Sequence, residues 1–222
     1  MATKAPQNAD NSRQARIAEM RRAEQARDRR NKIVAISVTV LVLAGLGGFA
    51  AYYVNDKAEE KAAVKAAAEK MRKAPITAEK SWDAKKLGRN HVTTPVTYPM
   101  KPPVGGDHNP VWMNCNGDVY TKAVPDVNAV HSLEHGAVWI TYNDKAPKAD
   151  VEKLAAKVKK TPYTFMSPDQ DQAGAIMLSA WGKQVTVDGA GDARVDAFLT
   201  KYVTGPQTPE PGAPCTNGLA GQ

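Results

Sequence analysis

The pattern of apolar and polar positions divides the chain into distinct segments. Residues 33–55 carry no charge and are dense in Val, Leu, Ile, Ala and Gly, between Lys32 and Asp56. At about 1.5 Å per residue, such a helix is long enough to cross a bilayer. A cleaved signal peptide is the alternative, but its charged start would be much shorter than residues 1–32. The pattern therefore predicts a retained, single transmembrane helix.

The charges on either side of this segment predict its orientation. Residues 1–32 are rich in Arg and Lys, whereas residues 56–75 alternate in sign and have the pattern of a polar helical stalk. Because positive residues remain on the cytoplasmic side, we expect a cytoplasmic N-terminus and an extracytoplasmic remainder at the cell membrane. The arm accounts for much of the net charge of +7. We expect a lipid bilayer as its partner, and no nucleic acid, although an Arg-rich arm alone would suit either.

Beyond the stalk, alternating runs of β-rich and helix-periodic residues predict a mixed domain. Prolines and the pair Gly105-Gly106 make residues 81–110 a long ordered loop. Apolar periodicity predicts the later elements. The expected strands are 119–120, 137–142, 161–166, 175–180 and 184–187, with turns at 167–169 and 182–183, and the expected helices are 126–135, 150–158 and 192–204.

This order predicts an α+β domain. From residue 137 it runs β-α-β-β-β-α, the element order of thioredoxin-like domains. There is no C-x-x-C motif, so dithiol chemistry does not follow from that likeness. The predicted organisation is a cytoplasmic basic arm (1–32), a transmembrane helix (33–55), a helical stalk (56–75), an extracytoplasmic globular domain (76–205) and a Pro/Gly-rich tail (206–222).

The two cysteines, Cys115 and Cys215, both fall on the predicted outer side. An oxidising compartment favours a disulfide between them, which would tie the tail back to the domain and contribute about 2–4 kcal/mol. The alternative, Cys115 as a metal ligand or nucleophile, leaves Cys215 unexplained.

The candidate functional residues gather in His131-Ser-Leu-Glu-His-Gly136. On a helix, His131 and His135 lie one turn apart on one face, where both imidazoles can meet one metal ion. A transition metal needs further ligands, and the turn at 105–110 presents His108 as the natural third. Glu134 would orient an imidazole as a hydrogen-bond acceptor. The alternative is that these residues form a hydrogen-bonded framework at a helix-to-strand corner.

Read as H-x-x-E-H, the same residues match the inverzincin peptidase pattern. Those enzymes take a further glutamate from a downstream helix, and only Glu152 and Glu210 follow His135. Glu152 lies too near, and Glu210 stands between two prolines in the tail. We therefore expect a binding protein rather than an enzyme.

Copper is the metal that the extracytoplasmic setting favours, ahead of zinc. Histidine and methionine suit Cu(II) and Cu(I), which makes Met166 and Met177 possible additional ligands. Methionine is more often a core residue, and that is the alternative for both.

Several segments together resemble the domain of unknown function 3105 family, whose members are membrane-anchored proteins found largely in actinobacteria. The shared segments are Pro102–His108, Gly117–Tyr120, His131–Gly136, Val138–Tyr142, Ala180–Gly182 and the closing Pro-Glu and Cys215. The resemblance covers roughly residues 80 to 215 and implies the anchored architecture, but no reaction. The expected function is a membrane-anchored metal-binding protein. The alternatives are a structural or assembly subunit of an envelope or respiratory membrane complex, and a metal-dependent hydrolase.

Overall fold

The computed structural model describes residues 19–22, 24–25, 27–32, 55, 57, 59–67, 69–70 and 72–220, and the chain forms two compact units, 1–64 and 65–222. Apart from Asn55, the predicted transmembrane segment lies outside the described residues. The described residues of the arm and stalk up to Lys73 are helical and exposed. Within the part of the chain that the structure describes, no helix has both the length and the apolar character that crossing a membrane requires.

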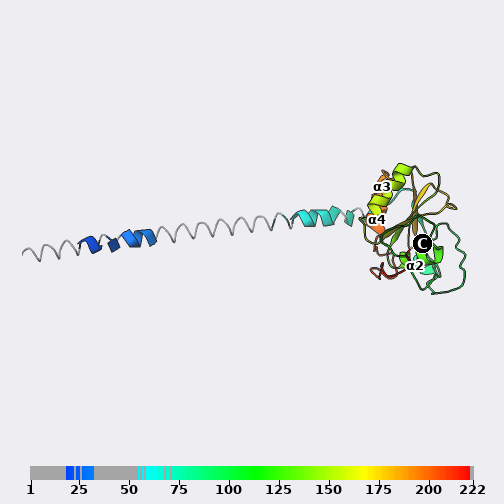
Figure 1. The fold of residues 1–222 in the computed structure, drawn as a ribbon, viewed down its shortest axis with the longest axis horizontal. Coiled ribbons are helices and arrows are strands. Elements are labelled where there is room, and N and C mark those ends of the chain that lie inside the picture. Colours follow the sequence, from blue (N-terminus) through cyan, green and yellow to red (C-terminus); the bar gives the residue numbers. More distant parts are fainter. Residues whose placement is uncertain are drawn as a thin grey trace, which may run out of the picture. The chain divides into compact units, whose positions relative to one another are not determined.

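A six-stranded mixed sheet forms the centre of the second unit (Figure 1). The strand order is β1-β6-β5-β3-β4-β2. The strands are β1 (Lys80–Ser81), β2 (Asn116–Val119), β3 (Val138–Tyr142), β4 (Thr164–Pro168), β5 (Ile176–Ala180) and β6 (Lys183–Val187).

The central strand β3 pairs parallel with β4 and antiparallel with β5. The parallel pair is joined by helix α3 (Lys148–Val158), and β5 and β6 form a hairpin before helix α4 (Ala193–Tyr202). The predicted β-α-β-β-β-α order is therefore present from β3 to α4. Short β1 was not predicted, because two residues are too few to show a strand pattern.

Helices cover both faces of the sheet. On one face, α3 and α4 enclose a core that includes Val138 and Ile140 of β3. On the other face, helix α2 (Asp126–Glu134) packs over Trp139 and Phe165. Successive side chains of a strand point to opposite faces, so β3 is buried on both sides, as its continuous apolar run predicted.

The turn predicted at 167–169 was wrong. Strand β4 continues through Ser167 to Pro168, which pairs with Tyr142. Proline can close a strand because the next N–H, that of Asp169, makes the bond to the Tyr142 carbonyl, at 2.8 Å.

The tail is tied back by the predicted disulfide. Cys115 and Cys215 are bonded, with 4.8 Å between their Cα atoms. Beyond the disulfide, Leu219 forms a parallel bridge with Met113. The C-terminal segment thus lies beside the loop that precedes β2, close to helix α2.

Candidate metal centre

Gly136 terminates helix α2 two residues after Glu134, and this helix end positions the candidate residues. Gly136 has a φ of +102°, its N–H bonds to the Leu133 carbonyl, and the N–H of Ala137 bonds to the Ser132 carbonyl. This is a Schellman motif, which requires the left-handed conformation that glycine adopts most easily. His131, Glu134 and the capping residue His135 therefore lie within the last turn and a half of the helix.

The tail completes this helix end. The N–H of Glu210 bonds to the Glu134 carbonyl at 3.0 Å, and the N–H of Gly212 bonds to the His135 carbonyl at 3.1 Å. The carbonyls at a helix C-terminus otherwise lack partners. Because Cys215 follows closely, the disulfide holds the tail where it can make these bonds.

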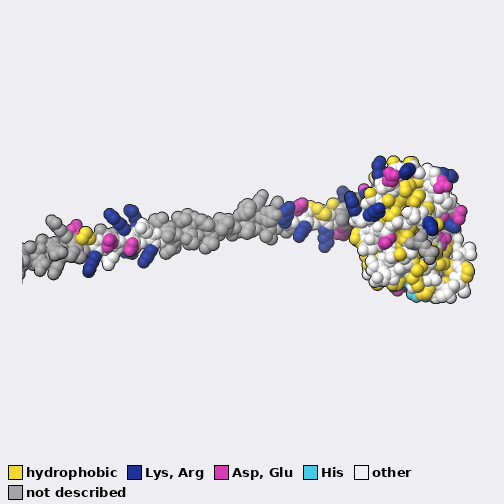
Figure 2. Space-filling model, in the orientation of Figure 1, with side chains coloured by type: hydrophobic (Ala, Val, Ile, Leu, Met, Phe, Trp, Pro, Cys, Tyr) yellow, Lys and Arg dark blue, Asp and Glu magenta, His cyan; other side chains and the backbone are white. Residues whose placement is uncertain are grey.

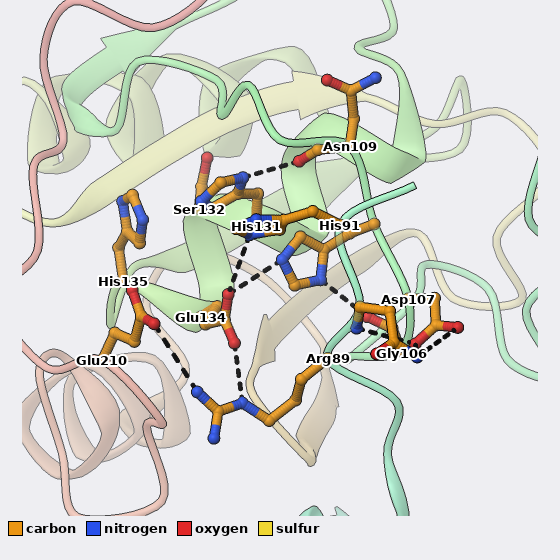
Figure 3. A network of polar contacts seen from close by, with 12 residues as sticks. Arg89, His91, Gly106, Asp107, Asn109, His131, Ser132, Glu134, His135 and Glu210 are labelled. Carbon is orange, nitrogen blue, oxygen red and sulfur yellow. Dashed lines mark hydrogen bonds and ion pairs between the residues drawn. The ribbon is translucent and has the colours of Figure 1, made fainter. Parts of the chain in front are cut away.

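Three histidines and one glutamate converge beside α2, and Figure 3 labels His91, His131 and Glu134 of this group. One ligand atom from each of His91, His108, His131 and Glu134 lies within 4.8 Å of every other. His108, His131 and Glu134 are at most 3% exposed. The His91 side chain is 50% exposed, and histidine reaches the surface at the lower edge of the domain in Figure 2. Three of the four residues of the group are thus buried, and the group is accessible beside His91.

Backbone carbonyls fix the orientation of the buried imidazoles. The Nδ1 atom of His108 lies 2.8 Å from the Gly106 carbonyl, and that of His131 lies 2.7 Å from the Asn109 carbonyl. A carbonyl only accepts, so each Nδ1 carries the proton. In the neutral ring, Nε2 then presents a lone pair, the arrangement that metal-bound histidines adopt.

The contact between His108 and Glu134 is the most informative in the group. His108 Nε2 lies 2.9 Å from Oε2 of Glu134, yet the alignment is not that of a hydrogen bond, and Nε2 is a buried atom without a partner. With Nδ1 donating elsewhere, a neutral His108 would bring two acceptors together. A proton on Nε2 or a cation shared by the two atoms is needed to make this contact favourable.

The pKa values of the two buried histidines shift in opposite directions. Burial lowers the pKa of His131 to about 4, so this ring is neutral near pH 7. Burial also acts to lower the pKa of His108, but Glu134, the Gly106 carbonyl and Asp107 together outweigh it and the pKa is raised. For Glu134 itself, burial opposes ionisation, but contacts with His108 and Arg89 lower its pKa to about 2. The group therefore contains a buried carboxylate that is ionised near pH 7.

Arg89 covers the outer side of this carboxylate. Its Nε lies 2.9 Å from Oε1 of Glu134, and its Nη2 lies 3.7 Å from Oε1 of Glu210 (Figure 3). The Arg89 side chain is 50% exposed. One carboxylate oxygen is thus held by a residue at the surface, and the other faces His108.

The structure brings together three of the predicted residues: His108, His131 and Glu134. The His135 ring contacts His131, with 4.5 Å between centroids, but His135 is not in the converging group. Its Nδ1 lies 2.6 Å from the Pro214 carbonyl, and burial lowers its pKa.

The two methionines lie on strands of the sheet. Met166 of β4 is packed in the core between the sheet and helices α3 and α4, and Met177 is buried on β5. Met166 is thus on the face of the sheet away from helix α2.

His91 was missed because it stands alone in the proline-rich loop. A bridge between the backbones of His91 and His108 places it in the group. No local spacing could reveal that pairing, although His91 was the remaining histidine of four.

A family model described as "Protein of unknown function (DUF3105)" matches residues 91–217. All four histidines and both cysteines lie within the match. No curated protein and no solved structure shows a significant match to the chain. Because the matched segment is more than half of the chain, this protein belongs to the DUF3105 family, as the sequence resemblance indicated.

Proposed function

We propose that this protein is a membrane-anchored metal-binding protein whose extracytoplasmic domain holds one transition metal ion. The ligands are Nε2 of His108, Nε2 of His131, the Glu134 carboxylate and the half-exposed His91. The observation that carries the proposal is the close approach of His108 Nε2 to Glu134 Oε2, because these atoms are both acceptors when His108 is neutral and a shared cation would stabilise the contact. Two fixed imidazoles, a third at the surface and one carboxylate are a sufficient ligand set.

Copper is the favoured ion, followed by zinc. Imidazole nitrogen and carboxylate oxygen suit both, and the general order of affinities places Cu²⁺ above Zn²⁺. The positions of Met166 and Met177 give no support to thioether ligation. The support for copper therefore rests on the imidazoles and favours Cu(II) over Cu(I).

Binding is favoured over hydrolysis. A general base needs a free carboxylate oxygen near its water, but Oε1 of Glu134 accepts from Arg89 and Oε2 faces His108.

The strand order β4-β3-β5-β6 supports a thioredoxin-like arrangement. Both cysteines are bonded to each other in one disulfide, so the thioredoxin-like arrangement does not indicate dithiol chemistry.

The alternative function, a structural subunit of an envelope complex, differs in whether a metal ion is required. Backbone bonds to the Nδ1 atoms of His108, His131 and His135 would also suit a rigid framework. A framework requires no metal, so metal stoichiometry separates the two functions.

The test is Cu(II) and Zn(II) titration of the full-length protein in detergent, with elemental analysis. We expect one ion per chain, lost in a His108→Ala/His131→Ala double variant that keeps its near-UV circular dichroism. The control is Glu152→Gln, on the exposed side of α3, which should bind as the wild type does. No metal above background in the wild type would reject the site and favour the structural alternative.

The anchor has its own test. Residues 33–55 and the basic arm support it by their composition. We expect the protein to remain with membranes during alkaline extraction and its C-terminal domain to be cleaved by protease added outside the cytoplasm. Release by alkaline washing would reject the anchor.

A further inference from the structure

A second cavity lies at the opposite end of α2 from the histidines. Its volume is about 490 Å³, it is open to solvent, and it is lined by the start of α2, the end of β4 and the loop around Pro95 to Lys101. Asp126 opens α2, whereas Glu134 closes it, about 12 Å away at the helical rise of 1.5 Å per residue. The lining residues therefore form a site separate from the histidine group.

The charges that line this cavity are unbalanced. Asp126, Asp169 and Asp171 contribute three carboxylates, and Lys101 contributes the one ammonium group. Lys101 Nζ is paired with Asp171 at 3.1 Å, and the two side chains are 47% and 75% exposed. Among the described residues, no cation forms a salt bridge with Asp126 or Asp169. Two negative charges thus remain inside the cavity.

Asp169 is the stronger indication of a ligand. It is 7% exposed and lines the cavity, and one of its oxygens, Oδ1, accepts from the N–H of Asp171 at 3.1 Å. The other oxygen, Oδ2, is buried with no hydrogen-bond partner. A buried carboxylate oxygen without a donor is costly, and a ligand that supplies an N–H would remove the cost.

The same excess of negative charge affects the pKa of Asp126. Burial raises its pKa, and Asp169 and Asp171 add to the increase against the opposing effect of Lys101. The carboxylates therefore act on one another across the cavity. A cationic ligand would relieve both their burial and their mutual repulsion.

The spacing and the walls indicate which kind of cation fits. Among the described residues, the one group of three or more close metal-ligating atoms is that of the histidines, so Asp126, Asp169 and Asp171 do not together surround a single metal ion. The lining also includes the apolar side chains of Pro95, Val96, Val124 and Trp139. A ligand with separated charges and a hydrocarbon body matches both features.

We propose that this cavity binds a small aliphatic diamine, with its two ammonium groups paired to Asp126 and Asp169. Two positive charges balance the two carboxylates that Lys101 leaves unpaired. The alkyl chain lies along the apolar wall, where burial of methylene groups adds affinity. The site is independent of the proposed metal centre.

The probe is 1,5-diaminopentane, titrated by calorimetry at low ionic strength and pH 7 into full-length, metal-free protein in detergent. We expect saturable binding at one site per chain, with n-pentylamine and 1,5-pentanediol each at least about tenfold weaker, because each lacks at least one ion pair. Absence of saturable diamine binding, or equal binding of the diol, would overturn the proposal.

Variants locate the site. Asp169→Asn and Asp126→Asn should each weaken diamine binding at least about tenfold. Asp126→Asn is the safer variant, since Asp126 is less buried than Asp169. The control is Asp196→Asn on α4, whose carboxylate is 65% exposed. Diamine affinity that is unchanged in both cavity variants, or lowered equally in the control, would overturn the assignment. Cu(II) titration of the same variants shows whether the metal centre is intact. A failure of the diamine proposal can therefore be distinguished from a failure of the metal proposal.

Discussion

The Nε2 atom of His108 and the Oε2 atom of Glu134 lie 2.9 Å apart in a site where neither side chain is more than 2% exposed. The Nδ1 proton of His108 is already committed to the Gly106 carbonyl. The contact is therefore stable with a second proton on the imidazole or with a cation bound to both atoms. The proposed metal binding would thus be an exchange in which the ion takes the place of that proton.

Glu134→Gln tests this relationship. The amide can still accept from Arg89 and can donate to the lone pair of His108, so the variant satisfies the pair without a cation. We expect metal-free stability within about 1 kcal/mol of the wild type and metal affinity at least about tenfold lower. The measurement is thermal unfolding with and without Cu(II), with Glu210→Gln as the control. A metal-induced increase in Tm equal to that of the wild type would show that Glu134 is not needed.

Arg89 should oppose metal binding, because its charge neutralises Glu134 from the outer side. We expect Arg89→Gln to bind Cu(II) about tenfold more tightly at low ionic strength, a difference of ~1.4 kcal/mol, and less so in high salt. The matched control is Lys148→Gln, at a side chain that is 91% exposed. Weaker binding in Arg89→Gln would instead mean that Arg89 chiefly positions the carboxylate.

The local parts of this site were predictable from the sequence, and the long-range parts were not. Helical spacing and Gly136 indicated the turn that carries His131 and Glu134. Arg89 and His91 belong to a loop without periodicity, and Arg89 reaches Glu134 across 45 residues of chain. Likewise, β3 was predicted from its own apolar run. Strand β1 forms because its two residues pair with β6, a long-range contact that the local sequence does not reveal.

Gly136 should be intolerant of a side chain. At its φ of +102° any Cβ is strained, and the Cβ would lie 3.0 Å from the Cα of Thr204. We expect Gly136→Ala to lower the free energy of unfolding by about 1–3 kcal/mol, measured by urea titration without metal. Gly191→Ala is the matched control, because its Cβ would meet no atom within 4 Å and the change should be nearly neutral. Equal stability of the two variants would contradict this account.

Asp192 stabilises α4 in a pH-dependent way. Its side chain accepts from the N–H of Arg194 at 2.9 Å, and its pKa is lowered chiefly by hydrogen bonds from the Arg194 side chain. A lowered folded-state pKa means stability that is present above the unfolded value, near 4, and lost as the pH falls below it. We expect Asp192→Ala to cost about 1–2 kcal/mol at pH 7, and less at pH 3. A cost that does not depend on pH would mean that the carboxylate charge contributes nothing.

The disulfide should keep His135 protected from solvent by holding the tail in place. The His135 Nδ1 atom is held by the Pro214 carbonyl, adjacent to Cys215. In a Cys115→Ser/Cys215→Ser variant we expect a loss of about 2–4 kcal/mol, because the closed loop no longer restricts the unfolded chain. With the tail released, His135 should also react faster with diethylpyrocarbonate, as mass spectrometry of peptides can measure. His108 is fully buried and bonded to Gly106, so its reactivity in the same sample is the control. If both histidines become equally reactive, the domain has unfolded; if neither does, the tail holds His135 without the disulfide.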